Sequence, residues 1–189
     1  MKHLFIFIFI IVYCFWGLEL GVTSSSSWWT HLTYSFQHAN FWHLILNSIS
    51  FFMFFRVLQK RIKPQLLAFS SWLIAVLASF LLLSPLRGDL GGLPLVGASG
   101  MVYAMTGIYI GLVLSDAITR KIKIKNNFYI FLACLTLSLT LSFLKENSAF
   151  SLHLICMLSA CILSMLLNIF TKKKSNENQL LTFRSNQKN

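Results

Sequence analysis

A few polar residues in this chain have the types and spacings of a nucleophilic site. His38, His43 and Asn47 lie at the start of a long apolar run. Ser99 lies in the sequence Gly-Ala-Ser-Gly, and His153 begins another apolar run. A serine hydroxyl becomes a useful nucleophile when a base takes its proton and hydrogen-bond donors stabilise the oxyanion. Histidine can be that base, and histidine and asparagine can donate, so these residues could form a serine hydrolase site.

Six apolar runs must position these residues. A membrane-spanning helix needs about 20 mostly apolar residues, and each run approaches that length. We therefore predict an all-α polytopic membrane protein with a transmembrane domain over residues 1–170. We expect the basic and polar tail, residues 171–189, to be disordered in the cytoplasm. The predicted spans cover residues 4–20, 39–55, 65–83, 98–115, 128–144 and 150–170.

The composition supports a membrane protein. The chain is 56% hydrophobic and has 16 basic and 5 acidic residues, too few charges for the surface of a soluble domain. Its net charge of +11 could suggest a nucleic-acid partner, but the basic residues form short clusters between apolar runs. That arrangement is typical of cytoplasmic membrane loops. We therefore expect the chain to lie in a lipid bilayer and not to bind nucleic acid. The four cysteines lie in apolar segments and predict neither a disulfide framework nor a zinc site.

The first run has a second interpretation. Lys2 followed by residues 4–16 also resembles a signal peptide, with a weak cleavage site near residues 22–24. The run is bulky and aromatic, and no clean small-residue cleavage pattern follows it, which favours an uncleaved span. Both interpretations place residues 21–38 outside.

The basic residues predict the orientation. Fourteen of the 16 lie before the first run, in alternate loops or in the tail, and the remaining loops contain only Arg87 and Lys145. Cytoplasmic loops carry the excess of Lys and Arg, so both termini are predicted to be cytoplasmic. The fourteen are Lys2, Arg56, Lys60, Arg61, Lys63, Arg120, Lys121, Lys123, Lys125, Lys172, Lys173, Lys174, Arg184 and Lys188.

This topology gives the polar residues a common depth. The second, fourth and sixth spans would all run inward, so their N-terminal ends lie at the outer surface. Ser99 precedes Arg120 by 21 residues, or about 31 Å of helix, and His153 precedes Lys172 by 19 residues, or about 28 Å. The two side chains are therefore predicted to lie within one turn of each other in depth. Polar groups inside a bilayer generally face the bundle interior and have a function.

The spacing within the second span suggests separate roles for its polar residues. His43 and Asn47 are four residues apart and share a helix face. His38 and His43 are about 140° apart around a helix, so they do not converge as metal ligands would, and we predict no metal or other cofactor. The acidic side chains expected outside are Glu19, Asp89 and Glu146. None is placed to orient His153, which favours a Ser–His dyad over a triad.

These motifs resemble the rhomboid family of intramembrane serine proteases over about residues 4–170. The match rests on His38-x4-His43-x3-Asn47, on Gly97-Ala98-Ser99-Gly100 and on His153 in the last span. The resemblance implies that Ser99 is the nucleophile and His153 the general base. It further implies an oxyanion hole formed by His43, Asn47 and the Ser99 N–H, with His38 as a supporting polar residue, Gly97 as a motif glycine and Tyr103 packed beside His153.

Two positions depart from the family pattern. The family often has Trp-Arg in the first external loop, where this chain has Trp29-Thr30. After the histidine the family usually has a Gly-xxx-Gly stripe, where this chain has Cys156-xxx-Ala160 followed by Ser164. These are still small residues. We expect them to pack against Gly100-xxx-Ala104 and Gly107-xxx-Gly111 of the fourth span, because small residues let membrane helices approach closely.

We therefore expect an intramembrane serine endopeptidase in the cytoplasmic membrane of a bacterium, with single-span membrane proteins as substrates. One alternative is a non-catalytic rhomboid-like protein that binds transmembrane segments. Such relatives typically lack the serine or the histidine, and this chain has both. A small transporter is disfavoured because the inward-running spans lack ionisable residues at mid-depth and no inverted repeat is visible.

Overall fold

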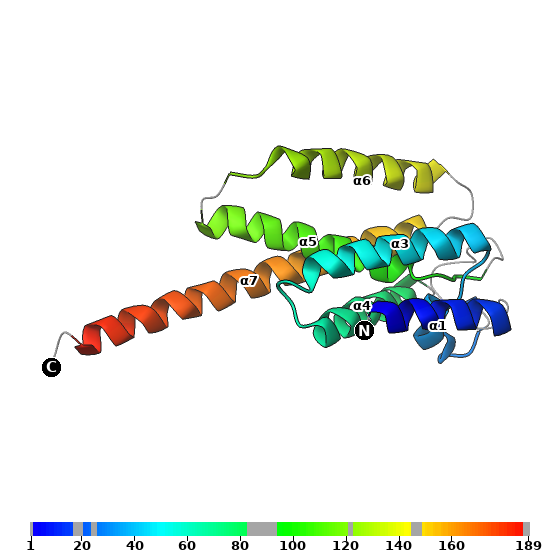
Figure 1. Cartoon of the computed structure of the whole chain (residues 1–189), viewed down its shortest axis with the longest axis horizontal. Helices are drawn as coiled ribbons and strands as arrows, with labels where there is room; N and C mark the ends of the chain where they lie inside the picture. Colours follow the sequence, from blue (N-terminus) through cyan, green and yellow to red (C-terminus); the bar gives the residue numbers. More distant parts are fainter. Residues whose placement is uncertain are drawn as a thin grey trace.

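The fold of the chain is helical. The computed structural model describes residues 2–16, 21–23, 26–82, 94–120, 123–144 and 149–186. In this part of the chain the regular structure is helical apart from one β-bridge between Val22 and Leu95, which confirms the all-α fold (Figure 1). The elements are α1 (Lys2–Phe15), α2 (Thr30–Thr33), the 3-10 helix η1 (Tyr34–Phe36), α3 (Phe41–Leu58), α4 (Pro64–Leu82), α5 (Ser99–Arg120), α6 (Asn126–Leu144) and α7 (Phe150–Asn186).

Four helices are long and apolar enough to cross a membrane by length and composition. These are α3, α4, α5 and α7 among the described residues, with mean hydropathies of 1.5 to 2.2. The other two predicted spans correspond to α1 and α6, whose apolar stretches His3–Phe15 and Asn126–Thr140 are shorter than a typical span. Helix α1 has only 14 residues, and α6 begins with two asparagines and carries several Ser and Thr residues. The count of six spans therefore stays a prediction.

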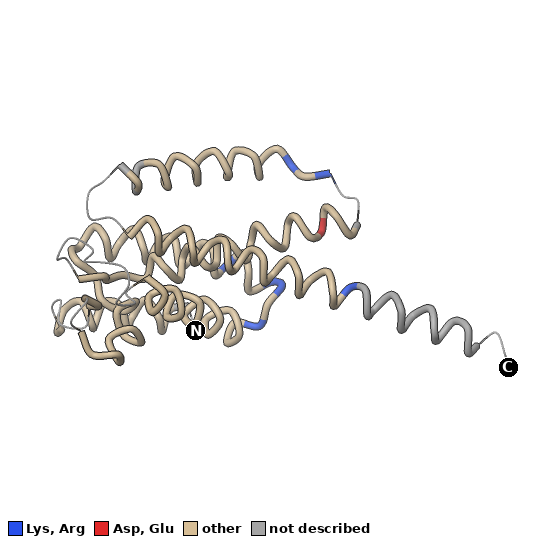
Figure 2. The backbone as a smooth tube through the Cα atoms, turned by 180° about the vertical axis from the view of Figure 1, so that it is seen from behind, with Lys and Arg blue, Asp and Glu red and all other residues tan. Residues whose placement is uncertain are grey.

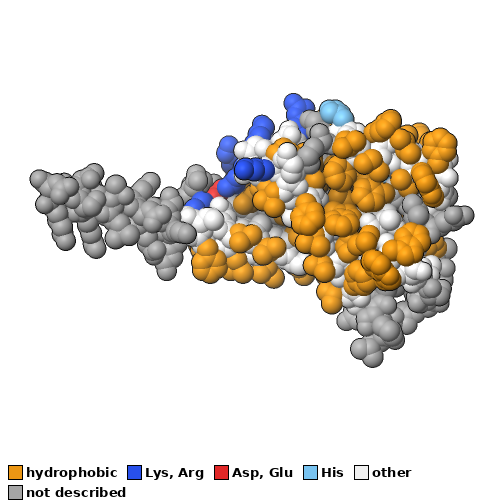
Figure 3. All heavy atoms as spheres, turned by 90° about the horizontal axis from the view of Figure 1, so that it is seen from below, with side chains coloured by type: hydrophobic (Ala, Val, Ile, Leu, Met, Phe, Trp, Pro, Cys, Tyr) orange, Lys and Arg blue, Asp and Glu red, His pale blue; other side chains and the backbone are white. Residues whose placement is uncertain are grey.

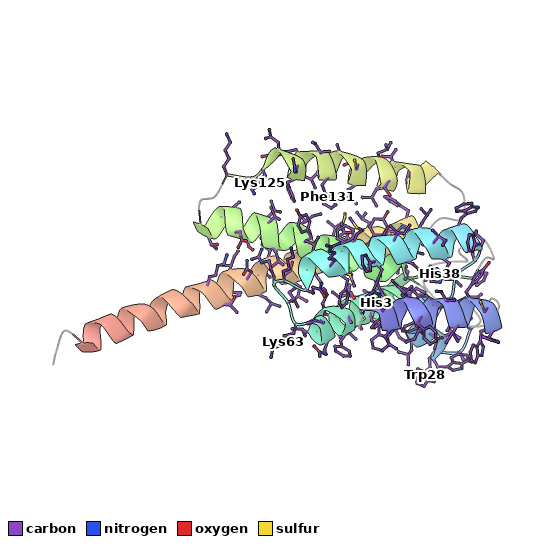
Figure 4. All side chains as sticks on the ribbon, in the orientation of Figure 1. His3, Trp28, His38, Lys63, Lys125 and Phe131 are labelled. Carbon is purple, nitrogen blue, oxygen red and sulfur yellow. The ribbon has the colours of Figure 1, made fainter. Side chains whose placement is uncertain are left out.

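Helix α5 is the centre of the bundle. It packs most extensively on α7 and also contacts α3 and α4. Helix α6 lies to one side of this group in Figure 1. Its Phe131, labelled in Figure 4, packs against Phe54 of α3 and Tyr109 of α5. Ser99 is therefore the first residue of the helix that contacts α3, α4 and α7.

The contact between α5 and α7 is made at two glycines. A Cβ atom at Gly107 would overlap the carbonyl oxygen of Met157, and one at Gly111 would overlap the hydroxyl of Ser164. The backbones therefore approach as closely as the small-residue pattern predicts. Gly100 differs from the prediction, because it faces Tyr34, Ala75 and Leu152 instead of the α7 stripe.

The same register runs along the whole α5–α7 contact. Five residue pairs join the two parallel helices from the first turn of each to the point where α5 ends. The residue numbers within each pair differ by 53 or 54, so the helices run side by side with no slip. The pairs are Ser99–His153, Gly107–Ala160, Gly111–Ser164, Ser115–Asn168 and Thr119–Lys172.

Helix α7 continues well past the predicted span. It is one helix of 37 residues and extends beyond the other helices in Figure 1, whereas the tail beyond residue 170 was expected to be disordered. Residues 171–186 contain neither glycine nor proline, the residues that most strongly interrupt a helix. A helix that is already anchored in the bundle can therefore propagate through this segment at low cost.

The charged and apolar surfaces are separate. In Figure 2 the described Lys and Arg residues gather toward the end of the bundle where α5 stops and α6 begins. There Asp116 accepts hydrogen bonds from Lys172 and, at 2.8 Å, from Arg61. Figure 3 shows hydrophobic side chains over most of one broad face of the bundle. Large hydrophobic side chains are exposed on several helices of the described chain, for example Leu46 of α3 and Leu163 of α7. This surface suits lipid contact.

Candidate active site

Ser99 and His153 meet at the N-terminal ends of the two central helices. Ser99 is the first residue of α5, and His153 lies in the first turn of α7. The His153 Nε2 atom lies 2.9 Å from the Ser99 Oγ atom, and the pair is partly buried. A neutral imidazole with its proton on Nδ1 accepts the serine proton in this geometry. The two side chains, which were predicted to lie within one helical turn of each other, thus form a direct hydrogen bond.

Tyr103 packs on the His153 ring. The ring centroids are 4.3 Å apart and the planes differ by 19°, so the rings are stacked. The Tyr103 hydroxyl lies 3.2 Å from the Ser138 hydroxyl of α6, and either can donate. Tyr103 lies one helical turn beyond Ser99 on α5. The same helix therefore carries the serine and the aromatic plane against which the imidazole lies.

The described part of the chain brings no carboxylate to this pair. Asp116 is engaged with Arg61 and Lys172, and it lies 17 residues beyond Ser99, or about 25 Å along α5. Glu19, Asp89 and Glu146 lie outside the described residues. The choice of a dyad over a triad stays a prediction.

The turn before Ser99 is shaped by Gly97. Its φ of 110° is a conformation that side-chain-bearing residues rarely adopt. A Cβ atom there would also lie 2.5 Å from His43 Cε1 and 3.2 Å from Asn47 Nδ2. His43 and Asn47 therefore point at the same turn, as their four-residue spacing predicted. Gly97 gives them the room to do so.

Helix α3 begins where its polar face meets this turn. Asn40 is the N-cap, and its side-chain oxygen accepts the backbone N–H of His43 at 2.9 Å. Asn40 is not among the residues predicted from the sequence, although an asparagine just before an apolar run is a recognisable helix start. The cap fixes where the helix begins and hence which residues of α3 face Ser99.

Asn47 has an unused hydrogen-bond donor. The residue is buried, and its Nδ2 has no hydrogen-bond partner within the described structure. Leaving a buried donor unpaired costs about 1–3 kcal/mol, so such groups often have a functional explanation. The backbone N–H groups in the first turn of α5 also have no partner inside the helix, and the helix dipole favours negative charge there.

His38 contacts the turn that precedes Ser99. Its ring is 2% exposed, and its Nε2 accepts the Ala98 N–H over a long 3.5 Å. The ring packs edge-on against Phe9 and lies 5.4 Å from the His43 ring. Burial, with a smaller effect of His43, lowers the pKa of His38 to about 3. The ring is therefore neutral near pH 7 and remains an acceptor for Ala98.

Residues before His38 also hold the segment that leads into Ser99. Val22 and Leu95 exchange both backbone hydrogen bonds, at 3.0 and 2.7 Å. The carbonyl of Tyr34 accepts the Gly97 N–H at 3.0 Å. Tyr34 is not among the predicted site residues, because no motif or periodicity connects it to a glycine 63 residues away. In Figure 4, His38 and Trp28 lie at the opposite end of the bundle from Lys63 and Lys125.

The comparisons with known proteins agree with this geometry. The family model of the rhomboid domain matches residues 25–170, which is most of the chain. The chain therefore belongs to the rhomboid family, and its apolar helices make it a multi-pass membrane protein. It is similar to the protein named "Putative rhomboid protease YdcA" from Bacillus subtilis (strain 168), with 28% identity over 160 residues. The alignment covers 79% of this chain and 72% of that protein.

Gly97→Ala should damage the site more than the fold. The new methyl group must displace the His43 ring, and the positive φ adds strain on the order of 1–3 kcal/mol. Because a shift of about 1 Å near reacting groups can cost 10²-fold in rate, labelling of Ser99 by a fluorophosphonate probe should slow by roughly that factor. The labelling rate and the unfolding midpoint in detergent measure the two effects.

Ala117→Gly is the matched control, since it exchanges the same two residue types farther along α5. A glycine inside a helix costs about 0.5–1 kcal/mol, so this variant should lose stability while its folded fraction is labelled at the normal rate. Equal labelling of the Gly97→Ala variant and the unaltered protein would show that the turn does not shape the site.

Proposed function

We propose that this chain is an intramembrane serine endopeptidase that uses a Ser99–His153 dyad. The main support is the 2.9 Å contact between His153 Nε2 and Ser99 Oγ, at a helix N-terminus beside the unpaired donor of Asn47. A base, a nucleophile and oxyanion donors are the groups that acyl transfer requires.

The reaction has two stages. Ser99 Oγ attacks the scissile carbonyl carbon while its proton passes to His153 Nε2, and a tetrahedral oxyanion forms. The Asn47 Nδ2, the His43 side chain and the backbone N–H of Ser99 donate to that oxygen. The imidazolium then gives its proton to the departing amine, and the acyl-enzyme is left. A water molecule, deprotonated by the same imidazole, hydrolyses the ester and restores Ser99.

Tyr103 restrains the imidazole of His153. In a triad the carboxylate holds the imidazole in the right orientation and stabilises its charged form. Here the stacked Tyr103 ring restrains the His153 plane, and the π face of tyrosine attracts a cation. Orientation and some charge stabilisation are thus available without a buried carboxylate.

The substrates we propose are single-span membrane proteins. The site lies beside His38, at the end of the bundle opposite Lys63 and Lys125 (Figure 4), and the described chain exposes many large hydrophobic side chains. A peptide bond inside a helix is inaccessible to Ser99, and unpaired backbone groups are costly in lipid. Segments that unwind easily near the outer surface should therefore be preferred.

A rhomboid-like protein that binds transmembrane segments without cutting them is the second candidate. The exposed apolar surface would serve binding equally well. The paired Ser99 and His153 favour the protease, because binding requires neither.

The dyad test uses Ser99→Ala, His153→Ala and the double variant. Each single change should abolish cleavage of a membrane-anchored reporter, and the double variant should be no worse because the pair acts as one unit. A fluorophosphonate probe should label the unaltered protein, leave Ser99→Ala unlabelled and label His153→Ala weakly.

Ser151→Ala, which removes an exposed hydroxyl from the same turn of α7, should cleave and label normally. Replacing Glu19, Asp89 or Glu146 singly should leave cleavage largely intact. A folded variant of one of these acids that is as inactive as Ser99→Ala would establish a triad. Normal cleavage by Ser99→Ala would exclude the proposed function.

Asn47→Leu should separate function from stability. The change removes an unpaired buried donor and keeps a similar shape, so the unfolding midpoint should stay the same or rise. Turnover should fall by roughly 10²–10³-fold if the amide is a main oxyanion donor.

Ser48→Ala is the matched control for Asn47→Leu. The Ser48 hydroxyl is also buried without a partner in the described structure, but it points about 100° away around α3, so turnover should not change. Full turnover in Asn47→Leu would remove this residue from the oxyanion hole.

The proposed orientation places both termini in the cytoplasm of a bacterial cell, across its cytoplasmic membrane. Reporter fusions after Lys63, Lys125 and Lys174 should then be active in the cytoplasm. Fusions after Ser27, Asp89 and Glu146 should be active on the opposite side. A cytoplasmic signal after Ser27 would put the site on the wrong face of the membrane.

A further inference from the structure

Tyr34 connects three parts of the molecule. It begins η1, and none of its surface is exposed. Its backbone carbonyl accepts the Gly97 N–H at 3.0 Å, two residues before Ser99. Its hydroxyl donates to the carbonyl of Ala75 on α4 at 2.8 Å. Burial raises the pKa of the phenol, so the hydroxyl keeps its proton and remains a donor.

The Tyr34 hydroxyl also lies against the first turn of α5. A Cβ atom at Gly100 would lie 3.1 Å from this hydroxyl and 3.1 Å from the Ala75 Cβ. Position 100 immediately follows the serine, so the side chain of Tyr34 fills the space between α4 and the Ser99 turn. Its backbone meanwhile holds the turn from the preceding side.

The segment that carries Tyr34 is itself fastened to α4. Trp72 Nε1 donates to the Leu32 carbonyl at 3.0 Å. His31 Nδ1 lies 2.8 Å from the Ser79 hydroxyl, and the His31 ring stacks on Phe80 at 3.9 Å. Together with the Tyr34 hydroxyl, these contacts attach residues 31–34 to one face of α4. Helix α4 contributes no reacting group, yet it supports the segment that holds Gly97.

We propose that Tyr34 is a positioning residue that sets the place of the Ser99 turn relative to α4. The inference rests on the proposed function, because it concerns the reactivity of Ser99. The hydroxyl fixes the ring on Ala75, the ring fixes the backbone of η1, and the backbone carbonyl fixes Gly97. Removing the hydrogen bond between the Tyr34 hydroxyl and Ala75 should therefore loosen the turn before Ser99, although no residue of that turn is changed.

A role limited to stability would have different consequences. If Tyr34 only fills the core, a variant that stays folded would keep the turnover number, kcat, of the unaltered protein. A positioning residue changes kcat with little change in KM, because substrate binding uses other groups. Local hydrogen exchange in residues 94–102 gives a second readout that does not depend on activity.

Tyr34→Phe is the central variant. It removes the hydroxyl and keeps the buried ring and the Gly97 contact. The assay is run well below the midpoint temperature of unfolding. There kcat should fall roughly three- to tenfold, the factor expected for one buried hydrogen bond, and KM should not change. Amide exchange in residues 94–102 should become faster, while exchange in the middle of α7 should not. Tyr109→Phe removes the same atom from a tyrosine packed on Phe128 and Phe131 and should change neither readout.

A double-mutant cycle tests the contact with Gly100. Gly100→Ala alone should slow fluorophosphonate labelling, because its methyl group meets the Tyr34 hydroxyl. In the Tyr34→Phe background that hydroxyl is gone, so the same change should cost less. Equal costs in the two backgrounds would show that the hydroxyl does not set the position of the turn.

The outcomes separate this inference from the proposed function. An unaltered protein that neither cleaves nor labels would refute the proposed function, and exchange in residues 94–102 would still decide whether Tyr34 holds the turn. An active protein whose Tyr34→Phe variant keeps both kcat and local exchange would overturn the positioning role and leave the dyad in place.

Discussion

The in-register packing of α5 against α7 is the constraint on which the rest of the structure depends. Gly107 and Gly111 let the two backbones approach, and a constant offset of 53 or 54 residues carries that register to Ser99 and His153. A slip of one turn would move Ser99 about 5.4 Å along the helix axis relative to His153. The same slip would drive side chains into the glycine positions. Close packing in the middle of the bundle thus sets a hydrogen bond at the N-terminal ends of α5 and α7, because a helix is stiff over this distance.

The turn before Ser99 is held by residues that lie outside the Ser99–His153 pair. Gly97 N–H binds Tyr34, Ala98 N–H binds His38, and Leu95 pairs with Val22. The chain lacks the Trp-Arg pair often found in the first external loop of the family, and contacts from Trp72 and Ser79 of α4 anchor this segment. Neutral, buried partners suit an apolar environment, where an unpaired charge would be expensive.

Two residues around Ser99, Asn47 and Gly97, suit the chemistry of the site. Asn47 leaves a donor unpaired in the folded protein, and Gly97 adopts a backbone conformation that few residues tolerate. The unpaired Asn47 donor lowers the stability of the resting protein, whereas glycine adopts a positive φ without steric strain. Both residues leave donors and space at the point where negative charge would develop, which is the arrangement expected of a preorganised site. The cost is offset by the tightly packed helices beneath.

The sequence alone predicted the six long apolar helices, the places where they begin and the common level of Ser99 and His153, because apolar run length and helical rise are local properties. The four-residue spacing of His43 and Asn47 likewise predicted that they face one spot. Local sequence could not predict that Tyr34 binds Gly97, that His38 accepts from Ala98 or that the amide of Asn47 stays unpaired. These contacts join segments about 50 to 60 residues apart in the chain and have no periodicity. Only the packing of α3, α4 and α5 around the serine turn decides them.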